Sequence, residues 1–252
     1  MTLSFVLLAV GLAHGVWTDI LQRFVTPKAR VDYARLAKEG LPALDGYLAA
    51  LAKPWPAEMP PAARKAALIN SYNALTVRWV TGHYPVASIW RTRHPFTAAR
   101  HTVNGRAYSL DQIETQLRDM GDPRVHAVLV CAARSCPPLR REAYVAEKLD
   151  AQLDDNTRAW LANRALNEFD PTSREAEVSR IFEWYRGDFE KNGGTVGIFL
   201  AKHGPHYAAF LQSGNARIRY RDYYWGLNDS GSAGDSYGSA AFYFDYFRNK
   251  YF

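Results

Sequence analysis

The sequence predicts an α+β protein, mostly helical with a small central β-sheet, and two observations lead to this prediction. Apolar residues recur at three- and four-residue spacing over several long stretches, which indicates amphipathic helices. The segments with strand character are short and do not alternate regularly with the helices, as an α/β protein would require. Hydrophobic residues make up 48% and charged residues 22% of the 252 positions, so the composition is that of a folded globular protein.

The long periodic stretches define the expected helices, at residues 31–51, 62–81, 143–163 and 196–210. The second of them is the most regular. Its Leu68, Tyr72, Leu75 and Trp79 follow one another at three or four residues, a spacing that predicts one buried stripe along the helix.

A hairpin is expected at residues 101–108. Residues 101–103 and 106–108 flank Asn104-Gly105, the dipeptide typical of a two-residue hairpin turn. Ser109 follows directly and is a suitable N-cap for a further helix.

A second strand is expected at residues 125–130. This segment is apolar and rich in β-branched side chains, with His126 as its only polar residue. Such a run is typical of a strand that is covered on both faces. We therefore expect it in the centre of the sheet.

The beginning of the chain resembles a signal peptide. Residues 3–12 form an apolar run that is too short to span a bilayer, and Ala13-His14-Gly15 has the form of a cleavage site. We therefore predict a signal peptide at residues 1–15 and a periplasmic or secreted protein. No Lys or Arg precedes the run, so the alternatives are a misassigned start, a retained anchor or a buried N-terminal helix.

The composition changes again near the C-terminus. Residues 16–228 are expected to form one globular domain, residues 229–240 a Gly/Ser linker, and residues 241–252 an aromatic C-terminal peptide. Twelve residues cannot build a core of their own. The peptide is expected either to dock on the domain or to bind a protein partner or a membrane interface.

The distribution of charged residues along the chain does not favour nucleic-acid binding. The formal net charge is +6, yet Lys and Arg are scattered among acidic residues, so no basic stripe is expected and only a weak contact with a membrane surface fits. The two cysteines lack a second Cys or His pair at zinc spacing, so no structural metal site is predicted. No cofactor is expected.

Several segments together resemble the family named domain of unknown function 547 (DUF547). They are NSYNALT at residues 70–76, SLDQIE at 109–114, the stretch 122–139 with DPRVH and CAARSCPPL, SRIFEWYRGDF at 179–189 and YYWGLN at 223–228. The family's name records that no activity is known. The resemblance implies an exported bacterial protein or a plant protein with a coiled coil. One difference is Thr115, since the family commonly has His at this position.

The two cysteines leave three interpretations open. If the chain reverses between Cys131 and Cys136, their Cα atoms face each other about 5 Å apart, which suits a disulfide in an exported protein. Cys136 in a loop beyond a strand could instead be a catalytic thiol, or both thiols could be unpaired. His126 and Cys131 are not expected to meet, because five residues of strand separate them by about 16 Å on opposite faces.

Other polar residues could line a cleft around these cysteines. His126 is either a hydrogen-bonded core histidine or an acid–base residue, and in both cases Glu114 is its expected partner. Asn70 and Asn73 share a helix face and either tie down a loop or support a catalytic histidine. Ser135 belongs to the cysteine loop. The aromatic cluster near Asp188 is either core or the rim of a pocket.

Two functional hypotheses follow. The first is a hydrolase or acyl transferase in which Cys136 or a histidine-activated water molecule is the nucleophile and His126 or another histidine is the base, with Glu114 supporting His126. The fold would be similar to that of papain or transglutaminase. The cleft residues Asn70, Asn73, Ser135 and Asp188 would bind the substrate. The second is a non-catalytic binding or assembly module, stabilised by a Cys131–Cys136 disulfide, that docks to a partner through residues 241–252.

Overall fold

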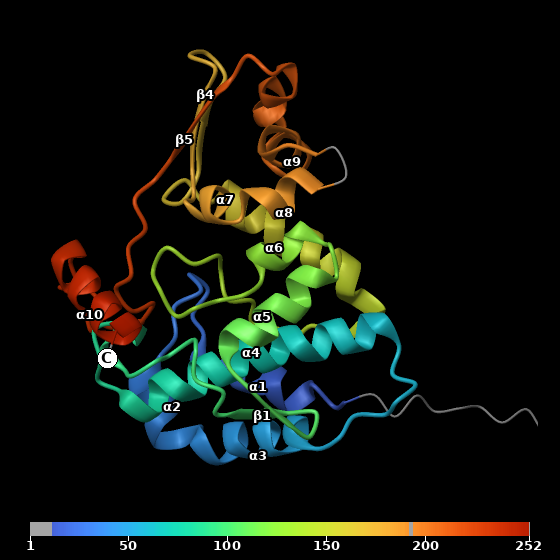
Figure 1. Cartoon of the computed structure of the whole chain (residues 1–252), viewed down its shortest axis with the longest axis vertical. Helices are drawn as coiled ribbons and strands as arrows, with labels where there is room; N and C mark the ends of the chain where they lie inside the picture. The colour runs from blue at the N-terminus through green and yellow to red at the C-terminus, as the bar shows by residue number, and fades with distance from the viewer. Residues whose placement is uncertain (1–11, 192–193, 252) are drawn as a thin grey trace, which may run out of the picture.

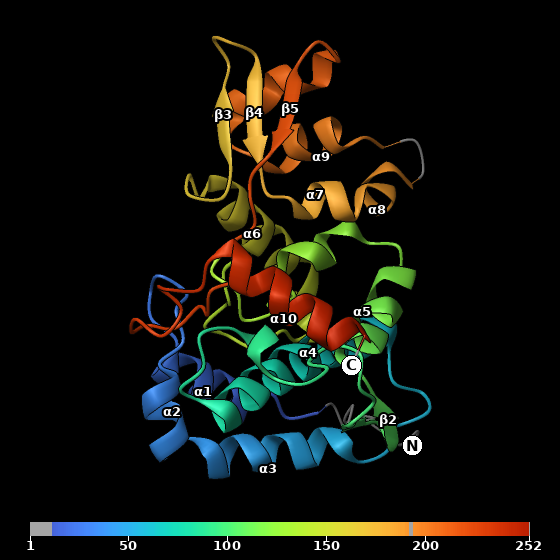
Figure 2. The same cartoon turned by 60° about the vertical axis from the view of Figure 1, so that its left-hand side comes forward.

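The computed structural model describes residues 12–191 and 194–251. Within them the protein is mostly helical with two small sheets, so the predicted α+β class is confirmed (Figure 1). The sheets lie at opposite ends of the molecule and not at its centre (Figure 2). Of the expected signal peptide, residues 1–11 lie outside the described residues.

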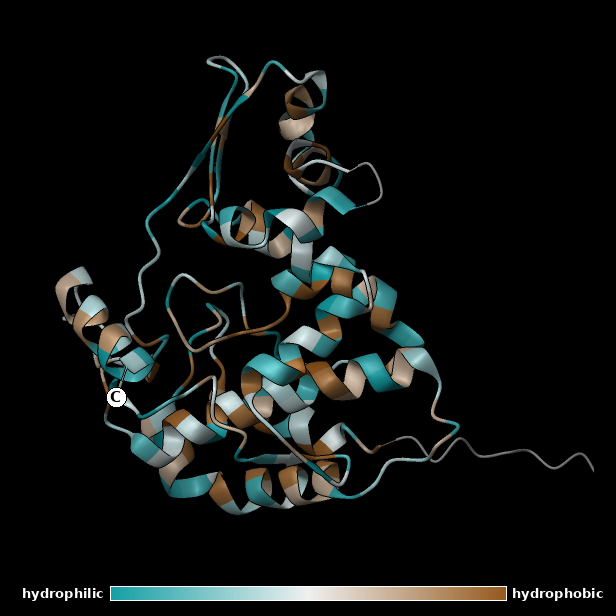
Figure 3. Cartoon of the chain, viewed as in Figure 1, coloured by the Kyte–Doolittle hydropathy of each residue, from teal (hydrophilic) through white to brown (hydrophobic). Residues whose placement is uncertain are grey.

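The larger part of the molecule is a helical body. It contains α1 (Gly15–Phe24), α2 (Tyr33–Glu39), α3 (Leu41–Ala52), α4 (Pro61–His83), α5 (Leu110–Asp119) and the 3₁₀ helices η1 (Ile89–Arg91), η2 (Pro123–Ala127) and η3 (Ala146–Lys148). Helix α4 contacts α2, α3, α5 and η3. Every residue of α4 from 66 to 77 is buried, so it is the centre of the body and not a helix with one buried stripe. Figure 3 shows hydrophobic positions along it.

A smaller part lies above the body in Figure 1 and holds the three-stranded sheet. It contains α6 (Leu149–Ala162), α7 (Ile181–Trp184), α8 (Arg186–Glu190), α9 (Val196–His203), η5 (His206–Ser213), β3 (Glu168–Asp170), β4 (Glu175–Val178) and β5 (Arg217–Tyr220). Strand β4 is central, antiparallel to β3 and parallel to β5. After β5 the chain returns to the body.

The expected helix over residues 31–51 is two helices, α2 and α3, which meet at Gly40. Gly40 is the C-cap of α2 and the N-cap of α3, and Pro42 lies in the first turn of α3. A proline is well tolerated there because the first backbone N–H groups of a helix have no partner within the helix. The break lets both helices pack on α4.

The hairpin prediction is confirmed. Strands β1 (His101–Val103) and β2 (Arg106–Tyr108) pair antiparallel, and Asn104 and Gly105 between them both have positive φ. Ser109 caps α5 with a full capping box, since its hydroxyl accepts from the Gln112 N–H and the Gln112 side chain accepts from the Ser109 N–H. Local sequence therefore determines this unit.

The predicted central strand at residues 125–130 is wrong. Residues 123–127 form the 3₁₀ helix η2, and residues 128–130 follow as irregular chain. Buried backbone still requires hydrogen-bond partners, and here side chains supply them. The Asn73 amide donates to the Val128 carbonyl at 2.9 Å and accepts from the Val130 N–H at 2.9 Å, while Asn156 donates to the Ala127 carbonyl at 2.6 Å.

The C-terminal residues are part of the domain. Helix α10 (Ser239–Tyr251) lies against η1, so the peptide docks on its own chain, one of the two outcomes expected. Residues 229–238 do not hang free: Tyr237 is buried, and the Ser230 N–H donates to the Val31 carbonyl at 2.8 Å. In the described part of the chain, no helix combines the length and the hydropathy that crossing a membrane requires.

The amide of Asn73 gives the first testable prediction. Replacing Asn73 with Ala leaves the Val128 carbonyl and the Val130 N–H unpaired in a buried site, which should lower the free energy of unfolding by about 2–4 kcal/mol. Urea denaturation measures this, with the exposed α5 substitution Thr115→Ala as the control. Equal stability of the two variants would contradict the role given to Asn73.

Candidate functional site

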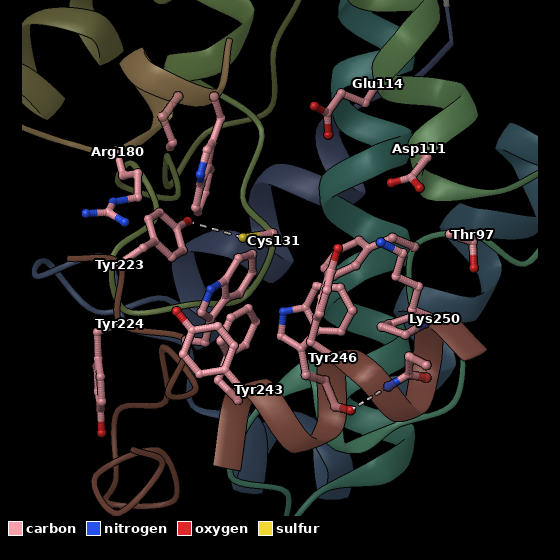
Figure 4. A pocket seen from close by; sticks show the side chains of 18 of the residues that line it. Thr97, Asp111, Glu114, Cys131, Arg180, Tyr223, Tyr224, Tyr243, Tyr246 and Lys250 are labelled. Carbon is pink, nitrogen blue, oxygen red and sulfur yellow. Dashed lines mark hydrogen bonds between the residues drawn. The ribbon is translucent and has the colours of Figure 1, made fainter. Parts of the chain in front are cut away.

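A cavity of about 900 Å³ lies where the helical body, the smaller part and α10 meet. Figure 4 shows Asp111 and Glu114 pointing into it from α5 on one side, with Tyr243, Tyr246 and Lys250 of α10 on the other. Helix η2 contributes His126, α7 contributes Trp184, and the segment after β5 contributes Tyr223 and Trp225. Cys131 also lines it. Its walls are largely aromatic, as is typical of ligand sites.

His126 is a buried titratable group of this cavity, and contacts with two neighbouring side chains define the orientation of its ring. Its Nε2 lies 2.9 Å from Asp188 Oδ2 in α8, and its ring stacks on Tyr185 with 4.2 Å between centroids. Nδ1 has no hydrogen-bond partner among the described residues. When Nε2–H donates to the carboxylate, Nδ1 keeps a free lone pair. Burial lowers the pKa of His126 to about 4, although the bond to Asp188 opposes this shift.

Asp188 is held as an anion from three directions. Arg118 Nε lies 2.6 Å from its Oδ2, Lys191 Nζ lies 3.2 Å from its Oδ1, and His126 is the third partner. Burial alone would raise the pKa of this carboxyl group, but these hydrogen bonds together lower it to about 2. The His126–Asp188 pair is thus an oriented neutral imidazole beside a fixed carboxylate.

The expected pairing of His126 with Glu114 is wrong. The carboxylate partner of His126 is Asp188, which lies 62 residues further along the chain in α8. The ring of Tyr185 stacks on His126. Glu114 still faces the cavity, and burial raises its pKa.

The two cysteines are close but not bonded. Their sulfur atoms lie 2.9 Å apart, whereas a disulfide bond measures about 2.05 Å, so the expected disulfide is absent and both thiols are free. The Tyr223 hydroxyl lies 3.3 Å from Cys136 Sγ and 3.4 Å from Cys131 Sγ. The Cys131 N–H also donates to Cys136 Sγ at 3.2 Å.

This arrangement gives the two thiols different acidities. The hydrogen bond to Cys136 and burial raise the pKa of Cys131 well above its ordinary value. Burial would also raise the pKa of Cys136, but the donors around it, the Cys131 thiol and the Tyr223 hydroxyl, lower it. The thiolate therefore forms first at Cys136, and Cys131 keeps its proton and donates it to that thiolate.

The other predicted site residues lie outside the main cavity. Asn70 uses both ends of its amide on the backbone of Tyr144, at 2.8 and 3.0 Å, so it ties down a loop, as Asn73 does. Ser135 accepts from the Tyr224 N–H at 2.9 Å. Cys136 lies behind Cys131 and lines a second cavity of about 260 Å³ with Arg30 and Arg134.

Sequence reasoning did not assign a role to several residues that shape the site. Arg118 is one turn beyond Glu114 on the same face of α5, and this i,i+4 spacing could have indicated it. Tyr185 and Tyr223 belong to recognised segments but were indistinguishable from core aromatics. The residues of α10 gave no such signal, because only the fold brings them to the cavity.

Among the described residues, no three Cys, His, Asp or Glu side chains are grouped as a metal ion would require.

The protonation of His126 can be measured directly. The Cε1–H resonance that disappears in His126→Gln should titrate with a midpoint of about 4, the pKa that burial imposes. Its pKa is lower in the folded protein than the value of 6.5 in an unfolded chain. The unfolded chain therefore takes up this proton first, and stability should fall as the pH drops from about 6.5 to 4. A midpoint of 6.5 or higher would contradict this environment.

Comparison with known proteins agrees with the resemblance noted in the sequence. Residues 56–161 match the family model described as Protein of unknown function, DUF547. The match includes Glu114, His126 and both cysteines, whereas Asp188 and Tyr223 lie beyond it. Neither the curated proteins nor the solved structures contain a match to this chain. The resemblance to DUF547 is thereby confirmed over residues 56–161.

Proposed function

We propose that this protein is a thiol-dependent hydrolase or acyl transferase with Cys131 as its nucleophile. The observation that supports this best is that a thiol and an oriented, neutral imidazole line the same cavity. Tyr185 lines the same cavity, and its ring stacks on His126. A thiol nucleophile with a base nearby is the arrangement that acyl transfer requires.

Cys131 is favoured over Cys136 because it faces the main cavity. The first step starts from the form of the protein in which Cys136 is deprotonated: the Cys131 S–H proton moves to Cys136 Sγ, which lies 2.9 Å from Cys131 Sγ. The Cys131 sulfur forms a bond to the acyl carbon, and the bond to the leaving group breaks. The leaving group takes the proton back from Cys136. The product is a thioester on Cys131 and a thiolate again at Cys136.

His126 acts in the second step. Its free Nδ1 takes a proton from a water molecule, whose oxygen attacks the thioester carbon. The carbon–sulfur bond breaks, and the Cys131 sulfur takes the proton from His126. Asp188 holds the imidazole ring through Nε2 and is a positioning residue. Where an alcohol or amine replaces water, the same step transfers the acyl group.

We further propose, from the apolar N-terminal run, that the protein works outside the cytoplasm.

An activated ester tests both steps. Incubation with p-nitrophenyl acetate should attach one acetyl group to Cys131, detected by peptide mass spectrometry, and Cys131→Ser should remove this adduct. His126→Gln should still become acetylated but should lose the acetyl group about 100-fold more slowly, because the base for water is missing. The control is His83→Gln, an exposed histidine outside the cavity. Acetylation elsewhere, or equal deacetylation rates for His126→Gln and the native protein, would refute the proposal.

The sulfur separation predicts sensitivity to oxidants. Diamide takes up two electrons and the two thiol protons as Cys131 and Cys136 form a disulfide, and this should abolish acetylation of Cys131 until a reductant is added. Cys136→Ser cannot form the bond, so its Cys131 should stay reactive to esters after diamide treatment. If diamide left the native protein fully reactive, the two thiols would not be as close as the structure has them.

A further inference from the structure

Helix α10 is attached to the domain by a buried polar anchor on its inner face. Asp245 is fully buried, and its Oδ2 lies 3.0 Å both from Arg91 Nε and from the Tyr237 hydroxyl. Asn249 donates to the Trp90 carbonyl at 3.0 Å and accepts from the His94 N–H at 2.6 Å. These contacts fix the rotation of the helix about its axis.

The aromatic residues of the inner face complete the attachment. Phe242 stacks on Trp225 with 5.3 Å between centroids, and Tyr246 meets Trp90 edge to face at 5.4 Å. The side chains with which α10 attaches to the domain are therefore already packed against it, with Asp245 buried and Phe242 and Tyr246 half-buried. The opposite face of the helix is not required for this docking.

That opposite face is aromatic and largely open to solvent, and Tyr243 at its edge also lines the main cavity. The exposed fractions are 58% for Tyr243, 68% for Phe244, 51% for Phe247 and 63% for Tyr251. At 100° per residue these four positions fall within an arc of about 100°, so they form one stripe along the helix, which we call the outer stripe. Figure 3 shows α10 at the edge of the molecule. Large aromatics gathered on one exposed face indicate a binding surface.

Positive charges flank the outer stripe. By the same rotation, Lys250 lies on one side of it and Arg248 on the other. The Lys250 ammonium lies 5.4 Å from the centre of the Tyr251 ring. Arg91 and Arg248 both pair with the buried Asp245 carboxylate, and their side chains are 48% and 38% exposed, so these three groups together keep one positive charge. The whole chain has a net charge of +6. Aromatic rings between cationic side chains match the interface of an anionic bilayer, where rings enter the headgroup layer and cations meet lipid phosphates.

We propose that α10 is an interfacial helix that binds the surface of an anionic phospholipid membrane through its outer stripe. The helix lies along the membrane plane and does not enter the hydrocarbon core. Because α10 also lines the main cavity, binding places the cavity beside the lipid surface. The proposal does not depend on the chemistry proposed for Cys131.

Co-sedimentation of the full chain with vesicles tests it. The native protein should bind vesicles that contain phosphatidylglycerol and should bind more weakly to pure phosphatidylcholine or at high salt. The double variant Phe244→Ser/Phe247→Ser should lower the partition coefficient at least about tenfold. The control is Ile198→Ser/Met120→Ser, which removes two apolar side chains of 47% and 41% exposure on α9 and after α5. Circular dichroism checks that both variants are folded.

Three outcomes would overturn the proposal. The first is no binding of the native protein to phosphatidylglycerol vesicles, as expected of a surface made for a protein partner. The second is equal binding by the two double variants. The third is a native dimer in gel filtration that only Phe244→Ser/Phe247→Ser dissociates, because the outer stripe would then join two copies of this chain.

Discussion

The candidate site depends on the pair of hydrogen bonds between Asn73 and the backbone of Val128 and Val130. These residues form the short irregular segment between His126 and Cys131. An extended strand here would separate the imidazole and the thiol by about 16 Å. The amide from the central helix provides the hydrogen bonds that a neighbouring strand would otherwise make, so the segment can bend while staying buried. The bend allows both groups to line one cavity.

Buried side chains also need polar partners, and such partners explain why a polar site persists inside an apolar core. The charge of Asp188 is balanced by Arg118 and Lys191, and the charge that forms first at Cys136 receives hydrogen bonds from Tyr223 and Cys131. Each buried group thus has a partner that stabilises the form in which it would work. His126 is kept neutral by burial, so it can accept a proton at neutral pH without first losing one.

Sequence reasoning predicted the parts of the fold that neighbouring residues determine. The turn at Asn104-Gly105 and the capping box at Ser109 depend on side chains within three residues of each other, and the structure contains both. The strand at residues 125–130 was predicted wrongly because an apolar run shows that a segment is buried but not what its backbone bonds to. That partner is Asn73, more than fifty residues earlier. The partner of His126 was missed for the same reason, since Asp188 lies 62 residues away.

The central claim is that Cys131 and His126 face one shared space. Alkylating Cys131 with iodoacetamide in the Cys136→Ser variant, where it is the remaining cysteine, and following the Cε1–H resonance of His126 tests it most directly. The added carboxamide would occupy the cavity beside the imidazole, so both the resonance position and its titration midpoint should change. If both stayed where they are in the untreated protein, the thiol and the imidazole would belong to separate environments, and the account of the site would be wrong.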